Sequence, residues 1–210
     1  MDIRKEPFDE NTERYERWFE RNKAVYLSEL KAVDKLLPKE GEGIEIGVGS
    51  GRFSEPFSVE YGLDPSREML KIAKKRGIRG IQGVGERLPF RGDRFDFVLI
   101  VTTICFFEEP QTALEEAQRI LKSGGEIIIG FIDKKSPVGQ EYRRKKEQNL
   151  FYREAEFYSV KEVEKMLKKA GFSDFRCSQT IFHRLDSVKG VEEPEEGSGE
   201  GSFVVIKGEK

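Results

Sequence analysis

The chain has 210 residues, of which 36% are charged and 37% are hydrophobic, and its formal net charge at pH 7 is -2. This length and balance are typical of one globular domain with its own core and exclude a largely disordered chain. The small net charge gives no general attraction to nucleic acid or anionic membrane, and no apolar run approaches the ~20 residues of a membrane span.

Weaker signals concern location and source. The first ten residues lack the apolar segment of a signal peptide, and Cys105 and Cys177 are too far apart in sequence to suggest a metal-ligand cluster. We therefore expect a cytoplasmic protein in a reducing compartment, without a metal site and without a membrane partner. Abundant Lys and Glu with few Asn indicate a thermophilic source.

The first predicted element is a long amphipathic helix over residues 12–37, with aromatic side chains at Tyr15, Trp18, Phe19 and Tyr26. From residue 43 onward, strand and helix patterns alternate. The fourth strand is almost entirely apolar, as expected of a strand covered on both faces. Strands are predicted at residues 43–48, 59–64, 78–84, 95–102, 125–133, 175–183 and 202–208, and helices at 66–77, 110–125 and 159–172.

Alternating strands and helices predict an α/β fold, a mainly parallel sheet with helices on both faces. Ligands of such sheets bind at the carboxyl ends of the strands, beside the first strand. The glycine-rich segment 47–51 lies at that place. Residues 192–201 are acidic and rich in glycine, and we expect them to form a mobile loop.

The glycine-rich turn differs from the dinucleotide fingerprint G-x-G-x-x-G/A. Gly47 and Gly49 fit it, but the last position is Arg52, and the third glycine comes one place early at Gly51. Glu45 stands two positions before the turn, where a carboxylate would repel a pyrophosphate and suit an ammonium group. The turn therefore indicates a ligand other than a dinucleotide.

The pattern Glu-x-Gly-x-Gly-x-Gly resembles the first motif of class I S-adenosylmethionine-dependent methyltransferases. Residues 61–70, 85–90, 95–101 and 115–129 resemble the later motifs of the small-molecule branch, of the methyltransferase domain 11 type, in the same order. The resemblance implies a doubly wound Rossmann-like three-layer sandwich. Its seven strands would run 3-2-1-4-5-7-6, with strand 7 antiparallel, and a cap at residues 1–40 would precede the methyltransferase domain at 41–210.

The resemblance also implies contacts with S-adenosylmethionine, whose product is S-adenosylhomocysteine. Glu45 would hold the methionine ammonium group, and Asp64 would accept hydrogen bonds from the ribose hydroxyls. The alternatives are a solvent-facing strand residue for Glu45 and a plain helix N-cap for Ser66, although Ser66 could serve in both ways. The expected cofactor-binding residues are Glu45, Gly47, Val48, Gly49, Gly51, Asp64, Pro65, Ser66, Met69, Gly85, Glu86, Thr102 and Thr103.

Two features depart from the family pattern. Val84 stands where an acidic residue usually contacts the adenine amino group, so adenine recognition would rest on backbone groups and packing. Only residues 52–58 join the glycine turn to the second strand, which predicts a very short first crossover helix interrupted near Pro56.

Methyl transfer requires alignment and exclusion of water, and it requires a general base only where the acceptor starts protonated. The candidates for such a group are Tyr15, Tyr142 and His183, the last of which could equally be an ordinary residue of the sixth strand. Cys105 would either line the pocket or pack in the core.

The acceptor pocket is expected to involve residues 134–158 and the N-terminal helix, whose aromatic face would cover the cofactor or pack in the core. Arg143, Arg144, Lys145 and Lys146 would bind an acidic substrate or form a solvated helix face. The Asn/Asp-Pro-Pro-aromatic motif of nucleic-acid amino methyltransferases is absent after the fourth strand. The expected partner is therefore a small-molecule acceptor rather than nucleic acid.

Two other functions stay open at this point. Tyr142 and Lys146 have the Tyr-x-x-x-Lys spacing of short-chain oxidoreductases that use NAD(P). A non-catalytic module that binds S-adenosylmethionine would keep the glycine turn but lack an acceptor pocket.

Overall fold

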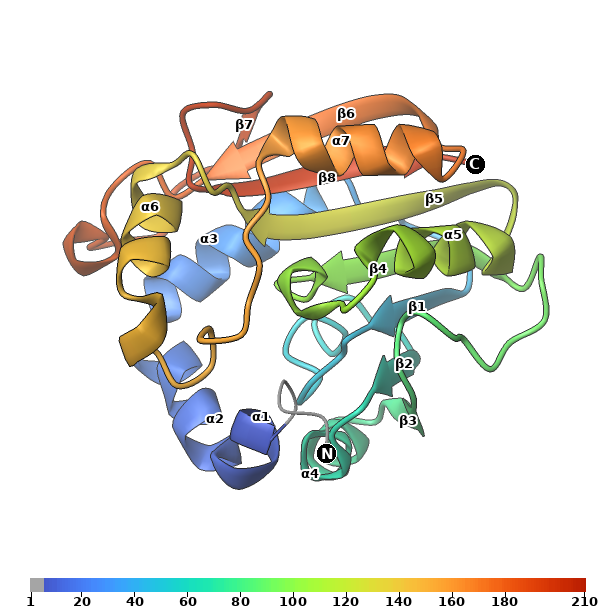
Figure 1. Cartoon of the computed structure of the whole chain (residues 1–210), viewed down its shortest axis with the longest axis horizontal. Helices are drawn as coiled ribbons and strands as arrows, with labels where there is room; N and C mark the ends of the chain where they lie inside the picture. Colours follow the sequence, from blue (N-terminus) through green and yellow to red (C-terminus); the bar gives the residue numbers. More distant parts are fainter. Residues whose placement is uncertain (1–5) are drawn as a thin grey trace.

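The computed structural model describes residues 6–210, which form one eight-stranded sheet with helices on both faces (Figure 1). Its spatial order is β3-β2-β1-β4-β5-β8-β6-β7, which confirms the predicted order and adds one strand at the edge. The strands are β1 Gly43–Ile46, β2 Tyr61–Asp64, β3 Arg79–Gln82, β4 Phe95–Val101, β5 Leu121–Ile132, β6 Ser173–Thr180, β7 Glu195–Glu196 and β8 Phe203–Glu209.

Strands β1 to β5 are parallel, and β8 pairs antiparallel with both β5 and β6, as predicted for the seventh strand. The additional strand, β7, lies in the segment expected to be a mobile loop. It pairs with β6, and the Gln179 side chain on β6 accepts backbone hydrogen bonds from Glu200 and Gly201 at 2.9 and 2.8 Å. These bonds hold the acidic segment against the sheet.

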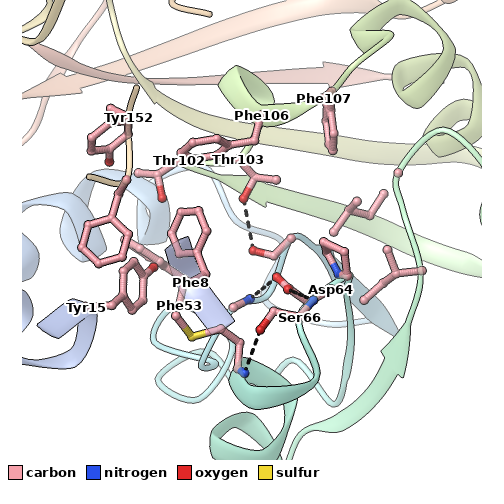
Figure 2. Close-up of a pocket in the computed structure, with 18 of the residues that line it drawn as sticks. Phe8, Tyr15, Phe53, Asp64, Ser66, Thr102, Thr103, Phe106, Phe107 and Tyr152 are labelled. Carbon is pink, nitrogen blue, oxygen red and sulfur yellow. Dashed lines mark hydrogen bonds between the residues drawn. The ribbon is translucent and has the colours of Figure 1, made fainter. Parts of the chain in front are cut away.

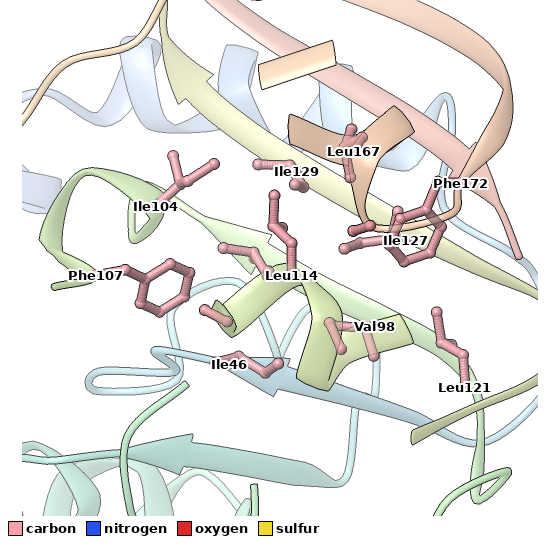
Figure 3. Packing of buried hydrophobic residues seen from close by; sticks show 14 of the residues in the cluster. Ile46, Val98, Ile104, Phe107, Leu114, Leu121, Ile127, Ile129, Leu167 and Phe172 are labelled. Atoms are coloured by element: carbon pink, nitrogen blue, oxygen red, sulfur yellow. The ribbon is translucent and has the colours of Figure 1, made fainter. Parts of the chain in front are cut away.

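Two apolar clusters cover the two faces of the sheet, because successive residues of a strand point to opposite sides. Val98 packs with α5 (Pro110–Ile120) and α7 (Val160–Lys169), as Figure 3 shows. Leu99, its neighbour on β4, packs on the other face with α3 (Lys23–Asp34). In Figure 1, α5 and α7 lie in front of the sheet and α3 behind it. The result is the predicted three-layer sandwich.

The predicted N-terminal helix is wrong as one continuous element. It consists of α2 (Thr12–Arg21) and α3, separated at Asn22 and preceded by α1 (Glu6–Glu10). Asn22 has ψ 38°, outside the helical range, and both its backbone N–H and its side-chain amide donate to the carbonyl of Trp18 at 2.9 Å. Residues 1–5 of the predicted cap lie outside the described residues.

Two further boundaries differ from prediction. The helix between β4 and β5, α5, ends at Ile120 rather than at residue 125. Leu121 is already the first residue of β5, where it pairs with Phe95. Residues 51–58 form consecutive turns instead of a short helix. Pro56 has no N–H to continue a helical ladder, and Ser58 adopts a left-handed φ of 55°.

The segment predicted as an insertion, 134–158, contains α6 (Pro137–Arg144) and the 3₁₀ turn Lys146–Gln148. Its Ser136 caps α6 by accepting the backbone N–H of Gly139 at 3.0 Å. Within residues 6–210, we find no helix with the length and apolar character needed to cross a membrane.

Candidate active site

A cavity of about 430 Å³ opens at the carboxyl ends of β1, β2, β4 and β5, beneath the N-terminal helices and α6 (Figure 2). This is the edge at which ligands of α/β sheets bind. It is lined by Phe8, Tyr15, Trp18, Phe19, Glu29, Ile46, Gly47, Gly49, Phe53, Leu63, Asp64, Pro65, Ser66, Met69, Val84, Gly85, Glu86, Thr102, Thr103, Phe106, Phe107, Glu108, Glu109, Ile132, Tyr142, Phe151, Tyr152 and Leu185.

The glycine turn after β1 is held by the backbone of β2. The N–H groups of Gly47 and Val48 both donate to the carbonyl of Leu63, at 2.7 and 3.0 Å. Gly47 has φ +76°, and a Cβ there would overlap the side chain of Thr103, whose hydroxyl donates to the Gly47 carbonyl at 3.1 Å. Gly49 is also left-handed, with φ +51°. Only glycine allows this turn to stay close to both the cavity and β4.

Asp64, the last residue of β2, is buried beside that turn. One carboxylate oxygen accepts the N–H of Gly49 and the other accepts the N–H of Ser66, each at 2.8 Å (Figure 2). Burial raises the pKa of Asp64 to about 6, although the two backbone hydrogen bonds oppose the rise. The carboxylate is therefore fixed in orientation at the floor of the cavity.

Ser66 has the predicted capping role and also lines the cavity. Its hydroxyl oxygen accepts the backbone N–H of Met69 at 3.1 Å, which caps α4 (Arg67–Lys75), and its hydroxyl donates to Asp9 at 2.5 Å. The second bond ties α1 to the base of the site.

Glu45 lies behind the glycine turn and does not line the cavity. Its side chain is 1% exposed and accepts a hydrogen bond from the hydroxyl of Ser54 at 2.5 Å. The solvent-facing alternative is wrong. Burial raises the pKa of Glu45 to about 8. Val48 and Gly51 also lie outside the lining; Val48 packs against Ala73.

The side of the cavity expected to face adenine is formed by Met69 and residues 84–86. Glu86 accepts the backbone N–H groups of Glu108 and Glu109 at 2.8 and 3.3 Å, and so fixes the loop after β4. Val84 is 39% exposed and offers only apolar surface and backbone atoms there.

Thr102 and Thr103 follow β4 and line the cavity, and the Thr103 hydroxyl donates to the Gly47 carbonyl (dashed in Figure 2). Thr102 has a left-handed φ of 51° while its N–H donates to the Gly130 carbonyl at 2.8 Å. A β-branched residue rarely adopts this conformation, and such strain is concentrated at functional positions.

A group of aromatic side chains covers the cavity. We call this group the aromatic lid, and it consists of Phe8, Tyr15, Phe106, Phe151 and Tyr152. The ring of Phe8 lies 5.1 to 5.7 Å from those of Tyr15, Phe106 and Phe151, and Tyr152 stacks on Phe106 at 5.6 Å. Three distant parts of the chain meet here. Their long separation in sequence explains why Phe8, Phe106 and Phe151 were not predicted as site residues.

Ion pairs between Glu16 and two arginines connect α2 to the glycine turn. The Glu16 carboxylate pairs with Arg52 and Arg76, both at 2.6 Å, and the Tyr26 hydroxyl donates to the Arg52 carbonyl at 2.5 Å. Arg52, which stands at the position of the missing third glycine, therefore binds the cap.

The three candidates for a catalytic group differ in location. Tyr15 and Tyr142 line the cavity, and burial raises the pKa of each well above its usual range. His183 was predicted on the sixth strand, but β6 ends at Thr180 and His183 is exposed, with Nδ1 2.8 Å from Glu192. The left-handed φ of Ile181, 61°, accompanies the end of the strand. The structure therefore places His183 outside the cavity lining.

Cys105 and the basic segment also lie outside the cavity lining. Cys105 packs with Ala155 and Phe157, and burial raises the pKa of its thiol to about 12. Arg143, Arg144 and Lys145 are exposed to solvent. The core alternative for Cys105 and the solvated alternative for these basic residues agree with the structure.

The sheet order, the glycine turn and the strand-end carboxylate define a Rossmann-like protein, a class whose ligands bind at the carboxyl ends of the strands. Residues 44–129 match a family model described as "Methyltransferase domain". An uncharacterised protein of Methanocaldococcus jannaschii, MJ1123, is 50% identical over 97% of this chain and 98% of its own length.

Solved structures agree with that match. A Thermotoga maritima structure, described as an SAM-dependent methyltransferase and "possible histamine N-methyltransferase", has a TM-score of 0.96 and 47% identity over 98% of this chain and 99% of its own. Phosphoethanolamine N-methyltransferase 2 of Haemonchus contortus, in complex with S-adenosyl-L-methionine, shares the fold with a TM-score of 0.63 and 17% identity, over 87% of this chain and 52% of that chain.

The chain belongs to the class I S-adenosylmethionine-dependent methyltransferases. It is an enzyme, and S-adenosylmethionine is its cofactor. The oxidoreductase alternative is set aside, since Tyr142 lines the cavity and Lys146 does not.

Proposed function

We propose that this enzyme transfers a methyl group to a small-molecule acceptor held under the aromatic lid. The observation that supports this most strongly is the joint position of Asp64, the glycine turn and the lid around one cavity. A ligand there would contact the cofactor-binding edge on one side and aromatic rings on the other. The cavity volume, about 430 Å³, suits small ligands rather than a folded macromolecule.

The residues present fit S-adenosylmethionine. At Gly47 the turn approaches β4 so closely that a Cβ would meet the Thr103 side chain, which leaves backbone groups near the cavity floor. The charged lining residues are all acidic, and among the described residues 6–210 no Lys, Arg or His lines the cavity. Acidic and aromatic groups suit a cofactor that carries a sulfonium and an ammonium group.

We assign cofactor contacts by their place in the cavity. Asp64, whose two oxygens are oriented by backbone N–H groups, would accept the ribose hydroxyls. Ser66 and Met69, with residues 84–86, would border the adenine. The proposed cofactor set is Gly47, Gly49, Asp64, Pro65, Ser66, Met69, Gly85, Glu86, Thr102 and Thr103, all of which line the cavity.

Glu45, Val48 and Gly51 would act from behind the turn. The hydrogen bond between Glu45 and Ser54 joins β1 to the first crossover, so Glu45 would position the turn that receives the methionine end. Gly51 packs against Ala73 of α4 and against Ile78, which a Cβ at position 51 would approach at 3.1 Å.

When bound, S-adenosylmethionine supplies an electrophilic methyl group on a sulfonium. The chain would bind it, orient the acceptor and exclude water, because positioning supplies much of the rate of an in-line displacement. The rings of the aromatic lid would exclude water above the site, and Thr102 and Thr103 would border the reacting region. Tyr15 and Tyr142 are protonated at neutral pH, so they would donate hydrogen bonds rather than act as bases.

The test is calorimetric titration of the purified, cofactor-free protein with S-adenosylmethionine, S-adenosylhomocysteine and NAD. We expect the first two to bind and NAD not to bind. A panel of small acceptors, including histamine because of the description of the Thermotoga relative, is then assayed for S-adenosylhomocysteine release. Cofactor binding without turnover on any acceptor would favour a non-catalytic module, and NAD binding alone would refute the cofactor-site assignment.

A further inference from the structure

Glu29 is a buried carboxyl group with no partner among the described residues 6–210. It lies on α3, its residue is 4% exposed, and it lines the cavity. Within residues 6–210, no hydrogen bond or ion pair engages its carboxyl group. The other buried carboxylates are bonded: Glu45 to Ser54, and Asp64 and Asp133 to backbone N–H groups. Few nearly buried carboxyl groups lack a partner, and the Glu29 oxygens are not among the fully enclosed unpartnered atoms of residues 6–210, so they border the cavity.

The helix does not require an acid at this position. The buried face of α3 otherwise consists of Val25, Ser28, Ala32 and Val33, so an apolar residue in place of Glu29 would pack against the same surroundings. A carboxyl group there lowers stability, and such a group in a ligand cavity indicates a functional role.

The surroundings of Glu29 are rich in aromatic rings, and the cation that lies over one of them, Arg52 at 5.2 Å from the ring centroid of Phe19, is paired with Glu16. The rings of Trp18, Phe19 and Tyr142 line the same cavity, and the charge of Glu29 raises the pKa of Tyr142, after the larger effect of burial. Among the described lining residues there is no basic side chain that could neutralise Glu29. A carboxylate among aromatic faces is a favourable site for an ammonium group.

The position of α3 separates Glu29 from the proposed cofactor contacts. α3 packs against β5, β8 and β6, whereas Asp64 ends β2, with β1 and β4 lying between β2 and β5 in the sheet. Ile132 at the end of β5 lines the cavity on the same side as α3. The half of the cavity near Glu29 is therefore the half left for the acceptor.

We propose that Glu29 is the acceptor-binding carboxylate, and that it selects a small molecule bearing an ammonium group. This inference rests on the proposed function, since it assumes that S-adenosylmethionine occupies the Asp64 side. An anionic acceptor would offer Glu29 no counter-charge and would be repelled by other acidic lining residues such as Glu86 and Glu108.

The electrostatics of Glu29 agree with this assignment. Burial raises the pKa of Glu29 to about 8, and within residues 6–210 no hydrogen bond or ion pair opposes this rise. An ammonium group within hydrogen-bond distance would supply the missing counter-charge. The ammonium group and the Glu29 carboxylate would then each have a hydrogen-bond partner.

The test uses phenethylamine and histamine, each beside the analogue in which a hydroxyl group replaces the aliphatic amine. Each compound is titrated by calorimetry into protein saturated with S-adenosylhomocysteine. We expect each amine to bind about ten- to a hundredfold more tightly than its alcohol, the range of a hydrogen bond to a charged group. Glu29→Gln should abolish this preference while its affinity for S-adenosylhomocysteine changes less than about twofold.

Glu20→Gln, a change at an exposed position on α2, is the matched control and should keep the preference. If neither amine binds better than its alcohol, or if the preference survives in Glu29→Gln, the inference is overturned while the proposed function stands. If wild-type protein fails to bind S-adenosylhomocysteine, the proposed function is refuted, and this inference with it. Thermal melting of both variants confirms that they are folded.

Discussion

Replacing Asp64 with alanine tests the cofactor-site assignment most directly. Each Asp64 oxygen already accepts one backbone N–H, from Gly49 or from Ser66, and each keeps a further lone pair for a ribose hydroxyl. Loss of hydrogen bonds to a charged group weakens binding by about 1–3 kcal/mol. Affinity for S-adenosylmethionine should therefore fall by a factor of about 5 to 150.

The same substitution should also lower stability. It leaves the N–H groups of Gly49 and Ser66 without their partner in a buried site, which costs about 1–3 kcal/mol per unsatisfied group. Calorimetric titration must therefore be made well below the melting temperature of Asp64→Ala, with folding confirmed by circular dichroism.

Asp96→Ala is the matched control. Asp96 accepts hydrogen bonds from the Glu42 backbone at 2.7 Å and from Lys122 at 2.8 Å, near the start of β4 and hence at the opposite end of the sheet. It should lose stability without losing affinity for the cofactor. An Asp64→Ala variant that is folded and binds S-adenosylmethionine as tightly as wild type would refute the ribose assignment.

Four further predictions follow from the same geometry. Cofactor affinity should fall by up to about tenfold between pH 7 and pH 5, because protons compete for the carboxylate of Asp64, whose pKa is about 6. Titrations at constant ionic strength that show an unchanged or rising affinity as the pH falls would contradict this prediction. Gly47→Ala should destabilise by about 1–3 kcal/mol more than Gly77→Ala in urea unfolding, since both residues are left-handed but a Cβ at position 77 has nothing within 4 Å; equal losses would show that the clash is relieved. Tyr15→Phe should leave the pH profile of turnover unchanged, because burial keeps this phenol protonated; loss of a limb of the profile would restore Tyr15 as a base. Glu29→Gln should stabilise the cofactor-free protein by on the order of 5 kcal/mol at pH 9 and by only about 1 kcal/mol at pH 5; a lower melting temperature at pH 9 would contradict the burial argument.

The sign of the last prediction depends on which state binds the proton more tightly. The pKa of Glu29 is raised in the folded protein to about 8 from its ordinary value of 4.5. The folded state therefore holds the proton more tightly, so stability is greatest below the unfolded pKa and declines as pH rises from about 4.5 through 8. Glutamine cannot ionise and lacks this decline.

Much of the fold could be predicted because its signals are local or periodic. The apolar run of β4 and the Ser66 cap of α4 gave the strand and helix positions, and the alternation of elements gave the parallel sheet. The predicted element boundaries were wrong where a local hydrogen bond competed with the periodic pattern of apolar residues. Asn22 interrupts a pattern that otherwise suits one helix, and β5 begins at Leu121 because pairing with Phe95 prevails over the helical pattern.

The candidate site likewise has a part that could be predicted from the sequence and a part that could not. The sequence by itself determined the glycine turn at residues 47–51 and the carboxylate Asp64, since both are fixed by chain geometry next to a strand end. Ser66, which follows Asp64 and caps α4, follows from the same local chemistry.

Only the tertiary structure decided which distant residues share the cavity. The aromatic lid joins three segments that no spacing relates, with Phe8 in contact with Phe106 and Phe151. The structure also places Glu45 behind the turn. It places Glu29 on a buried helix face, without a partner among the described residues. The physical reason is that a side chain's electrostatic environment depends on which elements pack around it, and packing joins residues without regard to their distance along the chain.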